Sequence, residues 1–528
     1  MSGQAIWAIA RADFLERTRR YGFFVTLLFA VFLGYQTAVG HLFMQLDSYR
    51  GVYTSGWIGA LMAMVITLFV SLSGFYIVKS GVQRDRETGV GAILAATPLS
   101  RPAYALGKWL SNFAVLAAIV AVLALAALVM QFVAAEDTHV NLWALLSPFL
   151  LVALPAMALT AAAALCFEIL PGLRGGIGNV VWFFVWTFAL SLPVAKENSP
   201  LDPLGMITVM RALTAEAKKY IPGYKGGIAF QIDVGHHAQV AQDFRWAGIA
   251  WTWESALGRL AWIAVAAILV AAVSQLFDRF DGAQTGQARR TPAAPAPPAL
   301  NSPARGLPAI PAAHAMKLAE VAPGSSFPAF AQMVVAELRL ALKGYGWWWY
   351  AVALGLLIAQ IASPLSATGV VLGVAWVWPV LVWSGLGTRE KTRGTQQVVF
   401  SCPEILARQF PAAWIAGILV ALLCGAGAGV KLALAGDLHG LSGWLAGAIF
   451  VPSLALFLGV WSGTSKFFEG LYMALWYVGP MHHTPRIDFT GSASGANAVR
   501  YALLYFALSA ALFVMAWLRR RVQINGLR

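Results

Sequence analysis

The chain has 528 residues, of which 59% are hydrophobic and 11% are charged, and its mean hydropathy is +0.69. This composition excludes a soluble domain of ordinary make-up and indicates an integral membrane protein. A formal net charge of +14 would be typical of a nucleic-acid-binding protein if the chain were soluble. Here the basic residues gather in short segments between apolar stretches, so no nucleic-acid partner is expected.

Twelve apolar stretches are predicted to cross the membrane as helices, because about 18 apolar residues in helical conformation cover the hydrocarbon core. The first six are residues 22–42, 57–78, 109–134, 142–168, 177–195 and 256–276. The second six are residues 346–363, 369–387, 411–434, 442–463, 470–480 and 499–518. The stretch 470–480 crosses only if its ends extend into flanking residues. The predicted fold class is therefore an all-α polytopic membrane protein with about 12 transmembrane helices.

Ahead of each set of six, apolar residues recur at helical spacing and predict an amphipathic helix along the inner membrane interface. These residues are Ile6, Trp7, Ala10 and Phe14 in the first set, and Met333, Val334, Leu338 and Ala341 in the second. A helix that lies wholly in the cytosol is the alternative. Basic residues concentrate before the first stretch, after the second and eighth, and at the C-terminus, so both termini are expected in the cytoplasm.

The segment "RDRETGVGAILAATP", residues 84–98, follows the second apolar stretch. Its spacing places four residues on one face of a two-turn helix that Pro98 ends. These are Val90, Ile93, Leu94 and Thr97. A helix this short is not stable alone, so it is expected to dock against a partner surface. An ordinary basic inner loop is the alternative, and it would explain the arginines.

A second segment of the same design, "REKTRGTQQVVFSCP", occupies residues 389–403, after the second stretch of the second set. In both segments Pro stands nine positions after Gly. The residues that share the helical face here are Thr395, Val398, Val399 and Cys402. The segments "ADFLERTRRYG" at 12–22 and "AELRLALKGYG" at 336–346 also match, with Ala, an acid, a base, Tyr and Gly at the same offsets. The chain is therefore predicted to be a tandem repeat of two six-helix halves.

Residues 282–328 are rich in Pro and Ala without periodicity, and they are predicted to be a disordered cytoplasmic linker. The first half is then residues 1–281 and the second half residues 329–528. Within the first half, the long loop 196–255 is expected outside the membrane. It is expected to form a small cap of re-entrant or interfacial helices with tryptophans at headgroup depth.

An entry helix and two spans precede an inner loop. This loop leads through Glu, Gly, a short helix and Pro to "SRPAYALGKWLSN". The arrangement resembles the permease of an ABC-2 type ABC transporter. The resemblance covers both halves. It implies that each loop is a coupling helix that seats in a cytoplasmic ABC ATPase, and it implies roles in ATPase coupling for two sets of residues. The first set is Glu87, Gly89, Ile93, Leu94, Pro98, Arg101 and Lys108, and the second is Glu390, Gly394, Val398, Val399, Pro403 and Arg408. The second loop departs from the first by having Leu406, Ala407 and Gln409 where the first has Arg101, Pro102 and Tyr104.

The resemblance also implies an exporter in the bacterial cytoplasmic (inner) membrane that moves a small molecule, peptide or lipid, with two separate ATPase subunits per chain. No phosphate loop of the form Gly-x-x-x-x-Gly-Lys-Ser/Thr occurs in the sequence. The chain itself is therefore not expected to be an enzyme, and ATP and magnesium belong on the partner ATPase. No catalytic, cofactor-binding or metal-binding residues are predicted. The pairs His236–His237 and His482–His483 lack a convincing third ligand.

Two other classes of function remain open at this stage. An ATP-independent secondary transporter or channel is one, although the spans are nearly free of the titratable residues that such proteins use. Glu168 and Lys431 lie near span ends, where an interfacial role is expected. A membrane scaffold that transports nothing is the other.

Overall fold

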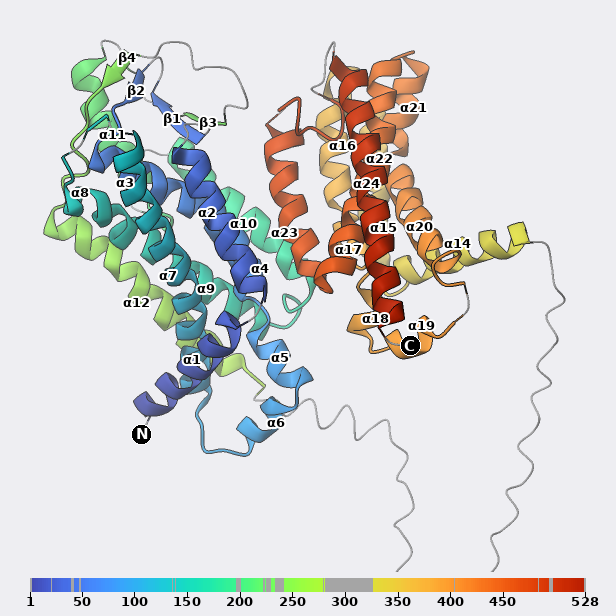
Figure 1. Ribbon diagram of the computed structural model, residues 1–528, viewed down its shortest axis with the longest axis horizontal. Coiled ribbons are helices and arrows are strands. Elements are labelled where there is room, and N and C mark those ends of the chain that lie inside the picture. Colours follow the sequence, from blue (N-terminus) through green and yellow to red (C-terminus); the bar gives the residue numbers. More distant parts are fainter. Residues whose placement is uncertain are drawn as a thin grey trace, which may run out of the picture. The chain divides into compact units, whose positions relative to one another are not determined.

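The computed structural model (Figure 1) describes most of the chain. The described residues are 2–19, 21–38, 42–46, 49–134, 136–137, 139–195, 201–221, 224, 229–232, 242–278, 280, 326–402, 404–482, 484–492 and 497–526. Nearly all of the predicted linker 282–328 and the residue Pro403 lie outside this set. The chain divides into two compact units, Met1–Thr285 and Gly286–Arg528, and each is described by itself below.

The first unit is mostly helical. Its helices are α1 (Ser2–Thr18), α2 (Tyr21–Ala38), α3 (Ser55–Val65), α4 (Ser71–Val78), α5 (Gly81–Glu87), α6 (Val90–Ala95), α7 (Arg101–Ala134), α8 (Leu142–Pro148), α9 (Leu154–Ile169), α10 (Gly176–Ala195), α11 (Met206–Tyr220) and α12 (Trp253–Val273). Single π-helical turns, Ile66–Val70 and Phe149–Ala153, join α3 to α4 and α8 to α9. A short 3-10 turn, Ser274–Leu276, follows α12.

Four short strands form one sheet in the order β3-β1-β2-β4. They are β1 (Leu42–Leu46), β2 (Tyr49–Gly51), β3 (Ala229–Ile232) and β4 (Gln242–Phe244). β1 pairs antiparallel with β2 and β3, whereas β2 and β4 are parallel. The described part of the loop 196–255 forms α11 and the strands β3 and β4, and its expected position as a cap outside the membrane stays a prediction. The predicted first span, 22–42, ends as a helix at Ala38. Trp246, one of the tryptophans of this loop, is buried and packs edge-on against Trp57 at 6.4 Å between ring centroids.

The second unit contains helices only, among the residues described. They are α14 (Ser326–Leu342), α15 (Trp347–Ala362), α16 (Thr368–Val377), α17 (Val380–Trp383), α18 (Arg389–Thr392), α19 (Gln396–Phe400), α20 (Gln409–Cys424), α21 (Ala426–Leu434), α22 (Leu438–Ser462), α23 (Ser465–Trp476) and α24 (Ala498–Asn525). A 3-10 turn, Leu365–Ala367, precedes α16, and a π-helical turn, Tyr477–Met481, extends α23.

The length and apolar character of these helices make the chain an integral membrane protein. Within the described residues, six continuous helical segments are long and apolar enough to span a membrane. They are Ser55–Glu87, Arg101–Phe132, Leu142–Ile169, Trp253–Leu276, Leu438–Ser462 and Ala498–Asn525. Two sharply bent pairs, α14 with α15 (105°) and α20 with α21 (64°), raise the number to eight if each counts as one span. Each predicted stretch overlaps a helix or a run of helices, although the first ends in β1 at Leu42, and the number twelve stays a prediction.

Burial divides the spans of each unit into central and peripheral helices. In the first unit, 78% of the apolar window of Ser55–Glu87 is buried, against 17% for Trp253–Leu276. In the second, the values are 78% for α22 and 28% for α24. Because the exposed residues of α12 and α24 are largely apolar, these two helices present surfaces suited to lipid.

Each unit places its short loop helices at one end. In Figure 1, α1, α5 and α6 lie at the end of the first unit opposite the sheet. In the second unit, α14, α18, α19 and the C-terminal end of α24 lie at one end and α21 at the other. The entry helix packs on the helix of the third predicted stretch in both units, α1 on α7 and α14 on α20.

Candidate functional site

The first candidate site is the two-helix loop between α4 and α7. α5 ends at Glu87, and Gly89 then adopts φ +76°, a left-handed conformation that glycine tolerates without steric cost. This residue turns the chain directly into α6. The predicted face of α6 is on the outside: Val90 is 42% exposed and Ile93 is 68% exposed, and Leu94 is half-buried.

The N-terminus of α5 is held by a single buried carboxylate, that of Glu168 at the end of α9. Its two oxygens accept hydrogen bonds from four consecutive backbone N–H groups, those of residues 80–83, at 3.1 Å from Gly81 and 2.7 Å from Val82. A negative charge at this position also opposes the partial positive charge of the helix N-terminus. Glu168 therefore fastens the loop to α9, which replaces the interfacial role that the sequence predicted for it.

A second buried carboxylate, Asp13 on α1, holds the loop from the other side. It accepts hydrogen bonds from Arg17 (2.8 Å), Lys108 (2.9 Å) and Ser111 (2.8 Å), and it also pairs with Arg84 of α5. Burial by itself would raise the pKa of Asp13, but the surrounding positive charges of Arg17, Lys108 and Arg84 lower that pKa well below its ordinary value. The carboxylate thus stays ionised and joins three elements, α1, α5 and α7.

Asp85, the neighbour of Arg84, extends the same network. The Lys108 Nζ lies 2.8 Å from the Asp85 carboxylate, and the Tyr104 hydroxyl donates to it at 2.7 Å. The Lys108 side chain is only 5% exposed. In this structure Lys108 is therefore an internal tie between the loop and α7. Its role in ATPase coupling, which the resemblance implied, stays a prediction.

The underside of α6 rests on aromatic rings. The ring of Tyr104 stacks on Phe277 at 5.2 Å and meets Phe280 edge-on at 5.7 Å. A Cβ added to Gly91 would lie 2.6 Å from the Phe280 ring, so only a glycine lets α6 approach this closely. The Arg86 guanidinium lies over both phenylalanine rings, at 6.0 and 5.8 Å. A cavity of only about 10 Å³ remains here, because the rings fill the space.

The second candidate site has the same local design. Gly394 adopts φ +65° and separates α18 from α19. On α19, Val398 is 72% exposed and Val399 is half-buried. Phe400 is buried and packs with Ile405 and Ile524, the latter from the end of α24. The predicted apolar face is again outward, and one aromatic residue anchors the helix from within.

Acidic side chains again hold this loop, one to the entry helix and the other to α24. Glu337 on α14 pairs with Arg389 of α18 at 3.3 Å and accepts a hydrogen bond from the Gln409 amide at 2.9 Å. Glu390 pairs with Arg520 of α24 at 3.3 Å and accepts a weaker bond from Gln409 at 3.4 Å. Gln409, which the sequence shows as a departure from Tyr104, thus contacts both acids.

The two networks correspond residue by residue. Arg84 and Arg389 each stand five residues before the left-handed glycine, and each pairs with the acid at the second position of the matched entry segments, Asp13 or Glu337. Asp85 and Glu390 each follow that arginine and accept from the residue at the position of Tyr104 or Gln409. The contact between entry helix and loop is therefore made twice, once in each unit.

The remaining predicted residues lie at the surface or at helix starts. Glu87 accepts a hydrogen bond from Gln83 on the exposed side of α5 at 2.7 Å, and Pro98 is exposed. Arg101 begins α7 and donates to the Gln275 carbonyl at 3.0 Å. Arg408 pairs with Glu404 at 2.5 Å and is half-exposed. Pro403 lies outside the described residues.

The charged anchors Asp13, Asp85, Glu337 and Arg520 were absent from the predicted set, because their partners lie far along the chain. A usable signal existed for two of them: both entry segments carry an acid at the same offset. A buried acid requires a positively charged partner. The basic side chains of the two nearby loops could have been predicted to supply it for Asp13 and Glu337.

The other predicted candidates carry less weight. In the described ranges, no group of three or more His, Cys, Asp and Glu side chains converges as a metal site would require. His236, His237 and His483 lie outside these ranges, and the exposed His482 contacts the Tyr477 carbonyl at 2.7 Å. Of the cysteines, which are all unpaired, Cys166 is buried and Cys402 is exposed beside α19.

No family model matches the chain, and no curated protein or solved structure is significantly similar to it.

Proposed function

We propose that the chain is the membrane subunit of an ATP-driven transporter of the ABC-2 permease type. The observation that carries the proposal is the pair of short, outward-facing apolar helices, α6 and α19, each braced by a buried acid–arginine pair to an entry helix. Exposed isoleucine and valine on a braced helix outside the spans are unfavourable in water. A partner that covers them removes this cost, and a groove on an ATPase is the partner of the proposal.

The proposed orientation places both loops in the cytoplasm. The end of the first unit that holds α6 also carries Arg17, Arg84, Arg86 and Lys108, and the corresponding end of the second unit carries Arg389, Lys391 and Arg519–Arg521. Clusters of Arg and Lys at one end of membrane helices favour the cytoplasmic side. The predicted location is the bacterial inner membrane.

Force applied to α6 has a rigid route to the membrane helices. α5 is fixed at its N-terminus to α9 by Glu168, and along its length to α1 and α7 by the Asp13 network. Movement of the docking helix would therefore be passed to α7 and α9 as a unit, without being absorbed by a flexible loop. The second loop has a comparable route through Glu337 and Arg520, to α14 and α24.

Two docking helices in one chain imply two ATPase subunits, and the absence of a phosphate loop from the sequence requires them to be separate polypeptides. Each transport cycle would draw the ATPases together on bound ATP and rock the two halves of the permease. Export of a small molecule, peptide or lipid is the proposed direction, on the strength of the resemblance.

The test is assembly with a phosphate-loop ATPase, which is sought first among the products of the neighbouring genes. Ile93→Asp and Val398→Asp place a charge on the two docking helices without disturbing a buried contact, because both side chains are more than two-thirds exposed. Each variant is expected to reduce co-purification of the ATPase at least tenfold and to abolish permease-dependent stimulation of ATP hydrolysis. Leu201→Asp, at a 59% exposed site in the loop 196–255, is the matched control and should leave both unchanged.

Two outcomes would favour the rival functions. Solute flux through the purified chain alone, insensitive to vanadate, would favour a secondary transporter or channel. An assembled complex that hydrolyses ATP without moving any solute would favour a scaffold.

A further inference from the structure

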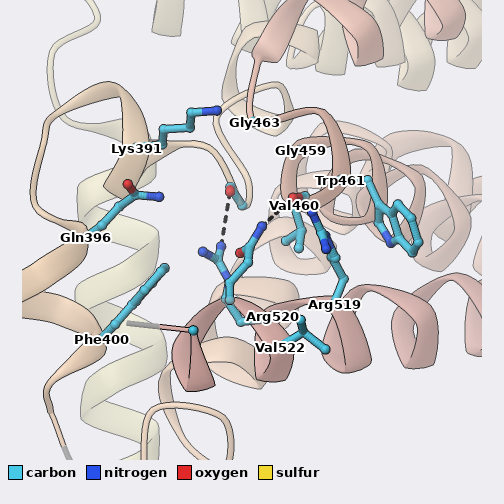
Figure 2. Close-up of a pocket in the computed structure, with 13 residues that line it drawn as sticks. Lys391, Gln396, Phe400, Gly459, Val460, Trp461, Gly463, Arg519, Arg520 and Val522 are labelled. Carbon is cyan, nitrogen blue, oxygen red and sulfur yellow. Dashed lines mark hydrogen bonds between the residues drawn. The ribbon is translucent and has the colours of Figure 1, made fainter. Parts of the chain in front are cut away.

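A cavity of about 420 Å³ lies beside α19 in the second unit. Figure 2 shows its lining, to which α18, α19, α22 and α24 contribute. Lys391 reaches it from α18, and Arg519 and Arg520 reach it from the end of α24. The 13 lining residues, all in the described part of the second unit, include no acid.

The described residues do not balance the charges around the cavity. Arg520 is paired with Glu390 at 3.3 Å and donates to the Gly387 carbonyl at 3.1 Å. Arg519 has no ion pair among the described residues; its guanidinium lies over the Trp461 ring at 5.4 Å. The ammonium of Lys391 lies close to Gly463, and no acid of the described chain pairs with it. Three cations therefore meet one carboxylate.

One donor in particular lacks an acceptor. The Nε of Arg519 is buried and has no hydrogen-bond partner within the described residues. A buried, unpaired guanidinium N–H is costly, and an anion is the acceptor that suits it best. Cations near helix C-termini also offset the helix dipole, and α22 and α24 both end here. That role leaves the orphaned Nε and the open volume unexplained.

We propose that this cavity binds a phosphate-bearing anion, held by Arg519, Lys391 and Arg520. A phosphate offers several strong acceptor oxygens and negative charge, which match two guanidinium groups and an ammonium that converge on one space. The volume is in the range of small-ligand sites and exceeds what one phosphate needs. An ester substituent on the phosphate therefore fits as well.

The residues around the cavity suit a lipid headgroup. Trp461, at the rim, is 53% exposed, and Val522 and Leu518 on the outer side of α24 are also exposed. Indole rings beside arginines are typical of the membrane interface, and basic pockets at the ends of transmembrane helices suit anionic headgroups. The acyl chains of such a lipid would lie along the exposed apolar face of α24. Free inorganic phosphate shares the same chemistry, and the experiment separates the two sources.

The site also touches α19, because Gln396 and Phe400 form part of the lining and Arg520 lies over the Phe400 ring at 4.9 Å. An anion bound here would neutralise the cations under the docking helix and fix α19 against α24. Binding of the anion itself does not depend on the proposed docking function.

The experiment uses the full chain purified in a neutral detergent. Binding of phosphatidylglycerol, of phosphatidylcholine with the same acyl chains, and of inorganic phosphate is measured by native mass spectrometry and by the shift in thermal unfolding temperature. Phosphatidylglycerol is expected to bind at least tenfold more tightly than phosphatidylcholine. Stabilisation by millimolar phosphate without a preference for phosphatidylglycerol would support the same site with free phosphate as its ligand.

Lys391→Ala and the double variant Lys391→Ala/Arg519→Gln locate the binding. Lys391 is exposed, so its removal alone leaves the fold intact; the expected loss of affinity is at least threefold for the single variant and tenfold for the double. Arg521→Ala is the matched control, because Arg521 is next to Arg520 but lies over Trp517, outside the cavity. The proposal is overturned if neither phosphatidylglycerol nor phosphate binds, if the two lipids bind equally and phosphate does not stabilise the chain, or if the double variant binds as the unchanged chain does.

Discussion

The two docking helices, α6 and α19, both expose an apolar face, but different kinds of residues pack against their inner sides. Beneath α6, the rings of Tyr104, Phe277 and Phe280 fill the space and leave a cavity of about 10 Å³. Beside α19, the end of α24 supplies arginines, and about 420 Å³ stays open. The chain segment that follows the last span of each unit makes the contact in both cases. An exposed apolar helix can therefore be braced by aromatic packing or by charge, and the latter leaves room for a ligand.

The acids that hold the two loops to their entry helices, Asp13 and Glu337, also differ in how deeply they are buried. Asp13 faces three cations, Arg17, Arg84 and Lys108, and its side chain is 3% exposed. Glu337 faces one cation, Arg389, and its own side chain is 11% exposed. The first loop should thus depend on its acid more than the second depends on its own.

The largest expected effect comes from Asp13→Ala. Removing this carboxylate leaves buried cations without their counter-charge, which costs about 3 to 5 kcal/mol in comparable buried pairs. Glu337→Ala should cost less, about 1 to 2 kcal/mol, since its partner is better hydrated. Thermal unfolding of the purified variants measures both. The control Glu16→Ala, on the same helix as Asp13 but with a side chain that is 48% exposed, should change the unfolding temperature little; a shift as large as that of Asp13→Ala would mean that burial of the pair is irrelevant.

The pH dependence of the same pair is the next test. Because the pKa of Asp13 is lower in the folded chain than its ordinary value of 3.8, the folded state favours the ionised form. The resulting stability is fully present above the unfolded pKa and is lost as the pH falls toward the folded pKa. The gap in unfolding temperature between the unchanged chain and Asp13→Asn should be constant from pH 8 to pH 5 and shrink below about pH 4. A gap that closes already near neutral pH would point to another group.

A smaller effect is expected at the two turns. Gly89→Ala and Gly394→Ala force a Cβ into left-handed backbone, at a cost of about 1 to 2 kcal/mol. Nothing lies within 4 Å of the added atom at either site, so strain in the backbone is the only cause, and the two costs should be equal. Gly175→Ala also has open space and lacks the positive φ, and it should be neutral. If the two substitutions lowered the free energy of unfolding by different amounts, the loops would differ in backbone conformation as well as in the residues that pack against them.

The smallest effect concerns the two residues that follow the docking helices. Tyr104→Phe removes the hydrogen bond to Asp85, and Gln409→Leu removes the bonds to Glu337 and Glu390. Each should cost about 1 kcal/mol, the usual net contribution of a hydrogen bond to stability. Thermal unfolding of the purified variants measures both costs. If Gln409→Leu leaves the unfolding temperature unchanged, Gln409 does not have the role in the second loop that Tyr104 has in the first.

Local patterns in the sequence predicted the helices well, because an apolar stretch and a helical spacing each depend on neighbouring residues. The positions of α6 and α19 and their outward apolar faces follow from such patterns, whereas the left-handed turns at Gly89 and Gly394 were not predicted. The sheet was missed for the opposite reason. β1 is an apolar run, "LFMQL", that continues the preceding helix in composition, and its partner strand β3 lies almost two hundred residues later.

The charged anchors were missed for the same physical reason as the sheet. Arg84 pairs with Asp13, 71 residues away in the chain, and Arg520 pairs with Glu390, 130 residues away. Contacts at such separations produce no local pattern in the sequence. The internal contacts of Lys108 could not be read from the motif either. Its partners Asp13 and Asp85 neutralise a lysine that is buried near the start of a long helix, and its role in coupling stays a prediction.

The most direct test of the docking proposal uses the exposed thiol of Cys402, which follows α19. A membrane-impermeant maleimide is applied to sealed inverted vesicles and to right-side-out vesicles, with and without the partner ATPase, and Cys402→Ser identifies the labelled site. The account predicts labelling in inverted vesicles only and at least tenfold slower labelling when the ATPase is bound. Labelling from the outer side, or a rate that the ATPase leaves unchanged, would contradict it.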